Sequence, residues 1–430
     1  MLHPKETLKL FSLLLNQKTA YKELVEFLFQ NKIPKSDDFL KELDPSSIVT
    51  EATFLNSGKT IISQPVKRPQ RTSRVRGSGD ECGMLRRILG DYCNISFIKT
   101  YKYRKRPAGI PKFSVVVPTF NGSHRINHTL ASLLLQVDIL PEEYEILVID
   151  DGSVDDTRSV VETFNSSKVS TGYIRLQKNY GPSTARNVGI LAARGDFICF
   201  TDDDCEVPPN WISSFQQAFE ENPEIAGVGG WYQTNENIDE SIFDRYMYWY
   251  SLPTATTNVK SATMGYNACG NSANVCYRRE VLLAVGGFNP VFRYPAVEDW
   301  ELKVRLHKNL FSLLAKPPPV RHRKRLTFSS YARAVILRGW GRFLLYKIHG
   351  IMPFYYNITL INLTVLTIQH WRKLLTNLDG TLKLPLREKI SFIFLAALTN
   401  FFFWIGKYLI PFELLEQRQK EMAEDEGLTM

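Results

Sequence analysis

Three consecutive aspartates, Asp202, Asp203 and Asp204, are the residues of this sequence that most clearly suggest chemistry. They follow an apolar run at residues 198–200 and precede two prolines at 208–209. This pattern predicts a buried strand that delivers three carboxylates into one loop. Adjacent carboxylates repel one another unless a cation neutralises them, and Mg²⁺ or Mn²⁺ does this while keeping positions open for phosphate oxygens. A solvated acidic turn is the alternative interpretation.

Residues of matching chemistry occur at three other places. Asp150 and Asp151 end an apolar run and can accept hydrogen bonds from the imide of a nucleobase and from ribose hydroxyls. Arg186, near the start of a predicted helix, can reach a base or a phosphate as a planar donor. Glu298 and Asp299 precede another predicted helix, where a carboxylate facing a metal site could act as a general base for a hydroxyl group. The alternative for this last pair is an acidic helix N-terminus, which the helix dipole stabilises.

The elements that must position these residues alternate between strands and helices. The sequence predicts strands at 113–117, 145–149, 173–176 and 197–200, and helices at 125–137, 155–164 and 182–193. Such alternation with short connections indicates an α/β fold with a mostly parallel sheet covered by helices on both faces. Ligands of such sheets bind outside the carboxyl ends of the strands, and both aspartate groups fall at strand ends of this kind.

The N-terminal quarter of the chain differs from this pattern. Residues 1–45 carry apolar side chains at helical spacing, whereas residues 56–79 are rich in Ser, Gly, Pro, Lys and Arg. We therefore expect an N-terminal helical extension at 1–55 that docks a protein partner or self-associates. A basic linker or arm is expected to follow at 56–110.

The C-terminal region is both basic and apolar. No acidic residue occurs between Glu301 and Asp379, within a chain of net charge +9. This favours contact with an anionic membrane surface or a phosphorylated substrate over nucleic acid, for which the sequence shows no binding motif. Residues 390–410 are about as long as a membrane span, and a buried hairpin in a further soluble domain is the alternative. Residues 354–371 either span the membrane or lie in its interface.

Taken together, the motifs resemble glycosyltransferase family 2, whose members have the GT-A fold. The segments that carry the resemblance are residues 117–121, 148–153, 181–187, 195–198, 202–204, 270–271, 286–288 and 298–299. They cover roughly residues 112–325, and each motif alone is weak. The resemblance implies a GT-A glycosyltransferase domain at 111–325. Independently of the resemblance, the basic flanks of the apolar segments predict a basic, membrane-associated helical region at 326–430, at the cytoplasmic face of the cell membrane.

The resemblance implies where a nucleotide-sugar donor binds. Phe120 would lie against the nucleobase, with Asp150 and Arg186 at the polar edge of that base, and Asp202 would approach the ribose. The glycine at 270 would permit close backbone approach in the donor-sugar pocket. The complete predicted donor-binding set is Pro118, Thr119, Phe120, Asp150, Asp151, Arg186, Asp202, Asp203, Gly270 and Asn271.

The resemblance also implies a metal site and a catalytic base. Asp204 would ligate Mn²⁺ or Mg²⁺, with Asp202 and His322 as the other residues of the metal site. Asp299, with Glu298 beside it, would deprotonate the acceptor hydroxyl. That hydroxyl would attack the anomeric carbon opposite the leaving diphosphate, which inverts the configuration of the sugar.

The predicted function is therefore a metal-dependent, inverting glycosyltransferase. It would move one sugar from a nucleoside diphosphate sugar, expected to be UDP-linked, to a hydroxyl of a glycan or lipid-linked acceptor. Processive synthases of the family carry a Gln-x-x-Arg-Trp motif, and the corresponding segment at 336–340 lacks the glutamine, which favours single addition. Transfer to a polyprenyl phosphate and an inactive protein that binds nucleotide-sugar are the alternatives.

Overall fold

The described part of the chain covers the central domain and parts of both flanking regions. The computed structural model describes residues 49–54, 59–60, 109–164, 168–230, 232–233, 241–251, 271–290, 292, 295, 297–308, 313–315, 318–323, 326–349, 368, 371 and 386–408. Three predictions lie wholly or largely outside these residues: the helices at 1–45, the sugar-pocket glycine Gly270 and the apolar segment at 354–371.

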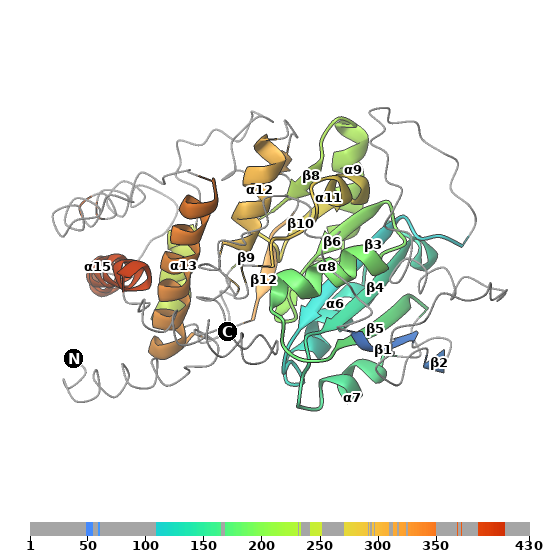
Figure 1. The fold of residues 1–430 in the computed structure, drawn as a ribbon, viewed down its shortest axis with the longest axis horizontal. Helices are drawn as coiled ribbons and strands as arrows, with labels where there is room; N and C mark the ends of the chain where they lie inside the picture. The colour runs from blue at the N-terminus through green and yellow to red at the C-terminus, as the bar shows by residue number, and fades with distance from the viewer. Residues whose placement is uncertain are drawn as a thin grey trace, which may run out of the picture.

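One large sheet forms the centre of the molecule (Figure 1). Its strands, in spatial order, are β11 (Leu313–Ala315), β8 (Gly227–Gly229), β10 (Val275–Arg278), β6 (Phe197–Phe200), β3 (Phe113–Thr119), β4 (Tyr144–Asp150), β5 (Ser170–Leu176), β1 (Val49–Phe54) and β2 (Lys59–Thr60). A small second sheet contains β7 (Cys205–Glu206), β12 (Val320–His322) and β9 (Tyr232–Gln233).

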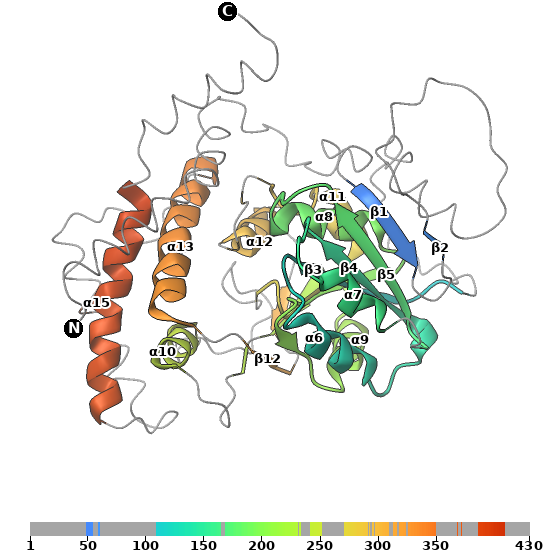
Figure 2. The ribbon, with the colours of Figure 1, turned by 90° about the horizontal axis from the view of Figure 1, so that it is seen from below.

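The helices of the central domain connect and cover the strands. They are α6 (Ile126–Leu134), α7 (Thr157–Glu162), α8 (Pro182–Ala192), α9 (Trp211–Glu221), α11 (Arg279–Ala284) and α12 (Glu298–Lys308), with a 3₁₀ turn η1 at Pro141–Glu143. Three further helices, α10 (Ile242–Ser251), α13 (Phe328–His349) and α15 (Leu386–Tyr408), lie to one side of the sheet (Figure 2).

Both faces of the sheet are buried. Successive side chains of a strand point to opposite faces, and an apolar cluster covers each face. In β3, Val116 packs in one apolar cluster with helix α8, whereas Val115 and Val117 pack in another with α6 and α9. Strand β4 alternates in the same way, with Leu147 in the first cluster and Val148 in the second. This explains why the strands read as continuous apolar runs in the sequence.

The prediction of a mostly parallel sheet is confirmed. Strands β6, β3, β4 and β5 pair in parallel, and among the described strands of this sheet only β10 and β1 run in the opposite direction. The register places Thr119 beside Asp150, so the ends of β3 and β4 lie at one edge of the sheet. The loop that follows β6 emerges at the same edge, because β6 is parallel to β3.

The N-terminal region departs from the predicted helical extension where it is described. Residues 49–54 form β1, which pairs antiparallel with β5, and β2 continues the sheet beyond it. A helix through residue 55 is therefore wrong for this part. The segment contains Val49, Thr50, Thr53 and Phe54, which favour strands, and β5 offers an unpaired sheet edge that the sequence alone does not reveal.

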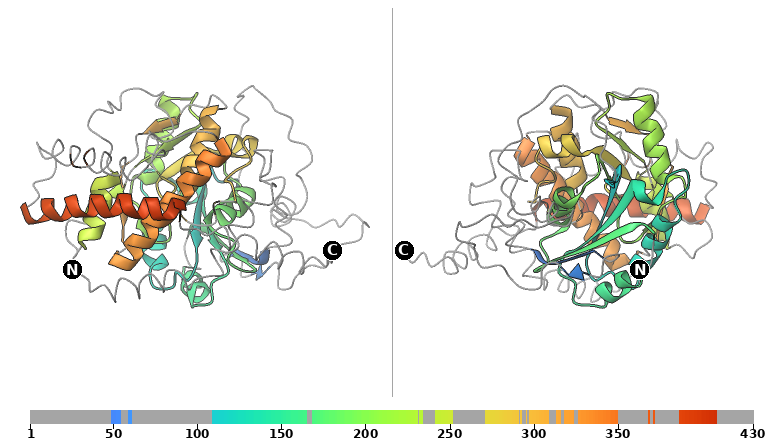
Figure 3. Two further views of the ribbon diagram at one scale, coloured as in Figure 1. Left: turned by 60° about the vertical axis from the view of Figure 1, so that its left-hand side comes forward. Right: turned by 90° about the vertical axis from the view of Figure 1, so that its right-hand side faces the viewer.

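The helices α10, α13 and α15 share an apolar core. Tyr246 of α10, Tyr331 of α13 and Phe402 of α15 belong to one buried cluster, and Figure 3 shows α15 crossing α13. The Tyr331 hydroxyl lies 2.6 Å from the Thr399 hydroxyl within this core. Helix α10 thus belongs in sequence to the predicted 111–325 domain but packs with helices of the 326–430 region.

Helix α15 does not bear out the membrane span predicted at 390–410. Within the described part of the chain, every helix is too short or too polar to cross a lipid bilayer. In α15, three charged residues at 387–389 precede the apolar run, Glu388 pairs with Arg245 of α10, and the buried Asn400 interrupts the run.

At the crossing of α13 and α15, we expect a glycine to be unusually sensitive to substitution. A Cβ on Gly406 would lie 2.1 Å from the backbone oxygen of Ile336, and one on Gly339 would lie 2.5 Å from that of Phe403. Alanine at a helix position ordinarily stabilises by about 1 kcal/mol relative to glycine. We expect Gly406→Ala to lower the thermal unfolding temperature instead, because the added methyl group would force the backbones of α13 and α15 apart. Ala397→Ser, at a half-exposed position of α15, is the control. Equal melting temperatures of Gly406→Ala and the wild type would contradict the close approach of α13 and α15.

Candidate active site

The Arg186 side chain joins three of the predicted motifs. It is only 2% exposed, although it lies near the start of α8. Its Nη2 donates to Asp202 Oδ1 at 2.9 Å and its Nη1 donates to Glu298 Oε1 at 3.0 Å. The guanidinium also lies 5.5 Å from the centre of the Phe288 ring. One buried cation therefore brings the loop after β6 against the start of α12.

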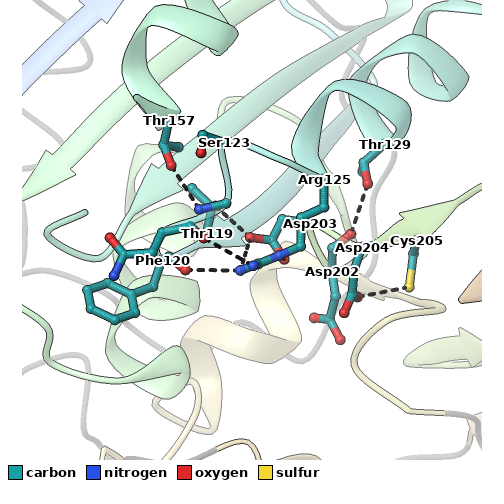
Figure 4. Close-up of polar contacts among 12 residues, drawn as sticks. Thr119, Phe120, Ser123, Arg125, Thr129, Thr157, Asp202, Asp203, Asp204 and Cys205 are labelled. Atoms are coloured by element: carbon teal, nitrogen blue, oxygen red, sulfur yellow. Dashed lines mark hydrogen bonds and ion pairs between the residues drawn. The ribbon is translucent and has the colours of Figure 1, made fainter. Parts of the chain in front are cut away.

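Asp203 faces the protein interior and fixes the loop that carries its neighbours. Its Oδ2 accepts from Thr119 Oγ1 at 2.6 Å and from Arg125 Nη2 at 2.9 Å, and its Oδ1 accepts from Arg125 Nε at 2.8 Å. Figure 4 shows Arg125 reaching from its own loop to both Phe120 and Asp203. Burial raises the pKa of the Asp203 carboxyl, an effect that Arg125 opposes. Both oxygens of Asp203 thus have protein donors, and its donor-binding role stays a prediction.

Asp204 and His322 form a pair suited to a divalent cation. Asp204 Oδ1 lies 3.4 Å from His322 Nε2, and the two side chains are 15% and 29% exposed. The pairing of β12 with β7 places His322 opposite Cys205, and the Arg323 backbone N–H donates to the Asp204 carbonyl at 2.8 Å. A carboxylate beside an imidazole, both reachable from solvent, fits Mn²⁺ better than Mg²⁺, which prefers oxygen ligands. The structure therefore brings these two predicted metal residues together.

Asp202, the third predicted metal residue, is turned toward α8. Its Oδ1 accepts from Arg186, which orients the carboxylate and leaves the side chain half-exposed. Its backbone carbonyl lies 3.5 Å from the Thr129 hydroxyl of α6. Asp202 is thus placed between the buried arginine and solvent, beside the Asp204 pair in the same loop.

Asp150 and Asp151 are buried and shape two turns. Asp150 Oδ1 accepts from the Ser153 backbone N–H at 2.8 Å, and its Oδ2 accepts from the Tyr173 hydroxyl. Asp151 Oδ1 and Oδ2 accept from the backbone N–H groups of Tyr180 and Gly181 at 2.7 and 2.8 Å. Gly181 has φ 95°, which glycine adopts readily, and α8 starts at the next residue. These carboxylates therefore position the helix that carries Arg186, and their predicted contacts with a donor stay predictions.

Phe120 is the exposed aromatic residue that the donor prediction requires. It follows Pro118 and Thr119 at the end of β3, and its side chain is 40% exposed. Arg125 Nη2 donates to its carbonyl at 2.9 Å, which fixes the backbone beneath the ring. An aromatic face held in this way is available to stack on a planar base.

Glu298 and Asp299 have different surroundings although they are adjacent. Glu298 is buried against Arg186, and burial raises its pKa to about 7. Asp299 is more open, with its Oδ2 3.9 Å from the buried Lys303 Nζ. Val297, directly before them, has φ 74°, an unfavourable conformation for a β-branched residue that commonly marks a functional segment.

Helix α12 is fixed to the loop before it by buried charges. Arg305 donates to Glu301 through Nε and Nη2 at 2.8–3.0 Å. Its Nη1 and Nη2 also donate to the carbonyls of Val285 and Gly287, both at 2.5 Å. This network holds the first turn of α12, and hence Asp299, in a fixed orientation.

Asn271 lies near the site without a described contact to the carboxylates. Its Oδ1 accepts from the Ala273 backbone N–H at 3.2 Å, in the turn before β10. Since Val275 of β10 pairs with Phe200 of β6, this turn lies beside the end of β6. Asn271 is therefore placed at the expected edge of the sheet, and its sugar-pocket role stays a prediction.

Three features of this site do not follow from the sequence analysis. The sequence predicts Arg125 only as the start of a helix, because no local pattern indicates that it pairs with Asp203, 78 residues later. Cys205 is not predicted to bind a metal, because the cysteines show no metal-ligand spacing with histidines; its position next to Asp204 is the signal that could have identified it. The Glu301–Arg305 pair was recognisable from its i,i+4 spacing, but its burial was not.

Part of this chain is similar in sequence to known glycosyltransferases. Residues 114–284 match the family model described as Glycosyl transferase family 2. The chondroitin synthase of Pasteurella multocida is 31% identical over 244 residues, which cover 48% of this chain and 24% of that protein. The GalNAc(5)-diNAcBac-PP-undecaprenol beta-1,3-glucosyltransferase of Campylobacter jejuni is 38% identical over 110 residues, covering 25% and 34%. The match thus spans about a quarter to a third of these relatives.

The chain also has a similarity to a solved structure. The mannosyltransferase PcManGT from Pyrobaculum calidifontis, in complex with GDP-Man and Mn²⁺, has a TM-score of 0.48 and 17% sequence identity. The comparison covers 72% of this chain and 90% of that chain.

Removal of the Arg186 charge should destabilise the protein strongly. Arg186→Met leaves Asp202 and Glu298 without their buried cation, and the loss of one partner from a buried ion pair costs about 3–5 kcal/mol. Arg158→Met is the control, because Arg158 pairs with Glu162 on the exposed face of α7 and its loss costs at most about 0.5 kcal/mol. Urea unfolding measures both variants. Similar free energies of unfolding for the two would show that Arg186 is not the connection described here.

The raised pKa of Glu298 predicts a pH dependence of stability. Its value is about 7 in the folded chain, against 4.5 for an ordinary glutamate, so the folded state retains a proton that the unfolded state has lost. Glu298 therefore contributes stability below about pH 4.5, and this contribution is lost as the pH rises to about 7. Relative to Glu298→Gln, the wild-type melting temperature should fall more steeply across this interval. Parallel curves of melting temperature against pH for the two proteins would contradict the raised pKa of Glu298.

Proposed function

We propose that this chain, whose residues 114–284 form a glycosyltransferase family 2 domain, transfers one sugar from a nucleoside diphosphate sugar to a hydroxyl group of an acceptor. The observation that carries this proposal is the Arg186 bridge between Asp202 and Glu298, beside the Asp204–His322 pair. It gathers carboxylates of two distant motifs at the sheet edge where ligands of α/β folds bind. We assign the domain to the GT-A fold on the same basis.

The donor would lie across the ends of β3 and β6. The exposed ring of Phe120 would stack on the nucleobase, and Asp202 would accept a hydrogen bond from a ribose hydroxyl. We take the nucleotide to be UDP, as the family resemblance of the sequence implies. One relative of this chain is a glucosyltransferase, which supports a hexose as the transferred sugar.

Asp204 and His322 would hold a divalent cation, with Mn²⁺ the better fit to a carboxylate–imidazole pair. Such an ion supplies charge neutralisation for a leaving diphosphate. Asp202 would assist from the same loop, oriented by Arg186. Asp203 holds that loop from within through Arg125 and Thr119.

Asp299 would act as the general base. Its carboxylate would accept the proton of the acceptor hydroxyl while the hydroxyl oxygen forms a bond to the anomeric carbon and the bond from that carbon to the diphosphate breaks. This displacement inverts the anomeric configuration. Glu298 is paired with Arg186 and would position the start of α12, and Arg305 would keep the helix from turning.

The acceptor and the location of the protein are part of the same proposal. The acceptor would be a glycan or a lipid-linked glycan, and the basic interval between residues 303 and 373 would hold the protein peripherally at an anionic, cytoplasmic membrane face. A polyprenyl phosphate is the competing acceptor, because a phosphate nucleophile needs no base.

Nucleotide release from a UDP-sugar panel with Mn²⁺ tests this function. Asp204→Asn should abolish most release by weakening the metal site, and Asp299→Asn should lower it by about 10²–10⁴-fold through loss of the base. Glu220→Gln makes the same carboxylate-to-amide change on the exposed face of α9 and should leave release unchanged.

Two outcomes would count against parts of this assignment. Equal, slow release by the wild type and Asp204→Asn would contradict a catalytic metal site. Normal release by Asp299→Asn with a polyprenyl phosphate acceptor would replace hydroxyl attack by phosphate attack.

A further inference from the structure

A third side chain that can bind metals lies against the Asp204–His322 pair. Asp204 Oδ1 lies 3.4 Å from His322 Nε2 and 3.8 Å from Cys205 Sγ. One ligand atom from each of the three residues lies within 4.8 Å of the other two. Tetrahedral zinc, with bonds of about 2.0–2.3 Å, separates its ligand atoms by roughly 3.3–3.5 Å. The three atoms therefore need only small movements to share one tetrahedral ion.

The backbone holds these three residues in this arrangement. Cys205 and Asp204 are adjacent, and the antiparallel pairing of β7 with β12 places His322 directly opposite Cys205. The backbone hydrogen bond from Arg323 to Asp204 closes the same ladder. Because two strands and one loop fix the positions, the side chains converge without a bound ion.

Cys205 approaches the other two ligands from the protein interior. Its side chain is fully buried within the apolar cluster beneath α6 and α9, whereas Asp204 and His322 are partly open to solvent. Hard ions such as Mn²⁺ and Mg²⁺ bind a thiol weakly and leave its proton in place. A soft ion that binds thiolate strongly can displace that proton to solvent.

We propose that Cys205 is a third protein ligand for soft divalent cations, so that Zn²⁺ or Cd²⁺ binds Asp204, His322 and Cys205 and excludes the activating ion. The carboxylate and the thiolate then balance the charge of the cation, and a four-coordinate ion keeps one open position. A diphosphate that binds the ion through two oxygens needs more than one open coordination position. The inhibition that follows rests on the proposed function, whereas the binding of Zn²⁺ or Cd²⁺ does not.

Cadmium titration of the purified full-length chain tests the ligand directly. Cd²⁺ bound to a thiolate adds a charge-transfer absorption in the ultraviolet, and we expect it to saturate at one equivalent per chain. Cys205→Ala and Cys205→Ser should both lose this absorption. Cys276→Ala removes another buried thiol, from β10, and should keep it.

Zinc affinity, measured by competition dialysis, gives a second readout. Cys205→Ala should weaken Zn²⁺ binding by at least roughly tenfold, since even the loss of an indirect partner of a metal ligand costs that much. In assays with Mn²⁺, the Zn²⁺ concentration that halves nucleotide release should rise by a similar factor. Circular dichroism confirms that each variant is folded, and two different replacements guard against a folding defect in one.

The outcomes separate this inference from the proposed function. A cadmium absorption that persists in folded Cys205→Ala and Cys205→Ser overturns the ligand assignment, whatever the activity. A chain that shows the Cys205-dependent absorption but releases no nucleotide retains the ligand and loses the proposed function. Zn²⁺ inhibition that is equal in the wild type and Cys205→Ala overturns the proposed exclusion of the activating ion.

Discussion

The burial of one guanidinium, that of Arg186, is the constraint on which the site depends. A buried arginine cannot lose its proton, so the cost of removing it from water must be offset by carboxylates at hydrogen-bond distance. Asp202 and Glu298 supply them from a loop after β6 and from the first turn of α12. Any arrangement that separated these segments would leave a buried cation unpaired. The electrostatics of one residue thus specifies how two distant motifs meet.

A division between structural and accessible carboxylates follows from this geometry. In the aspartate triplet, Asp203 is saturated by Arg125 and Thr119, whereas Asp202 and Asp204 remain partly accessible. In the second pair, Glu298 is buried and Asp299 is more open. The buried carboxylates fix the backbone. This fixed backbone holds the accessible carboxylates close together despite their mutual repulsion.

The C-terminal helices are connected to the same site through α12. His349, at the end of α13, lies 3.0 Å from Glu301, the residue that also binds Arg305. Arg342 of α13 lies over the ring of Trp300, next to Asp299, and over Phe403 of α15. The helix that carries the proposed base is therefore packed against both the central domain and α13, which in turn contacts α15 through Arg342. Function and C-terminal packing cannot be altered independently at this contact.

The strand–helix alternation, and the sheet edge at which the carboxylates lie, could be predicted from the sequence. Those features follow from local periodicity and from the position of polar residues at strand ends, which need no knowledge of distant contacts. The family resemblance of the sequence also predicted Asp204 and His322 as residues of a metal site. Tertiary structure alone decided which carboxylates are buried, because the partners of Asp203 and Glu298 lie far away in the chain. It likewise decided that Cys205 meets His322 across β7 and β12, that residues 49–54 extend the sheet, and that α15 packs against α13. These outcomes depend on pairing between segments whose composition is compatible with several environments, and only packing selects one.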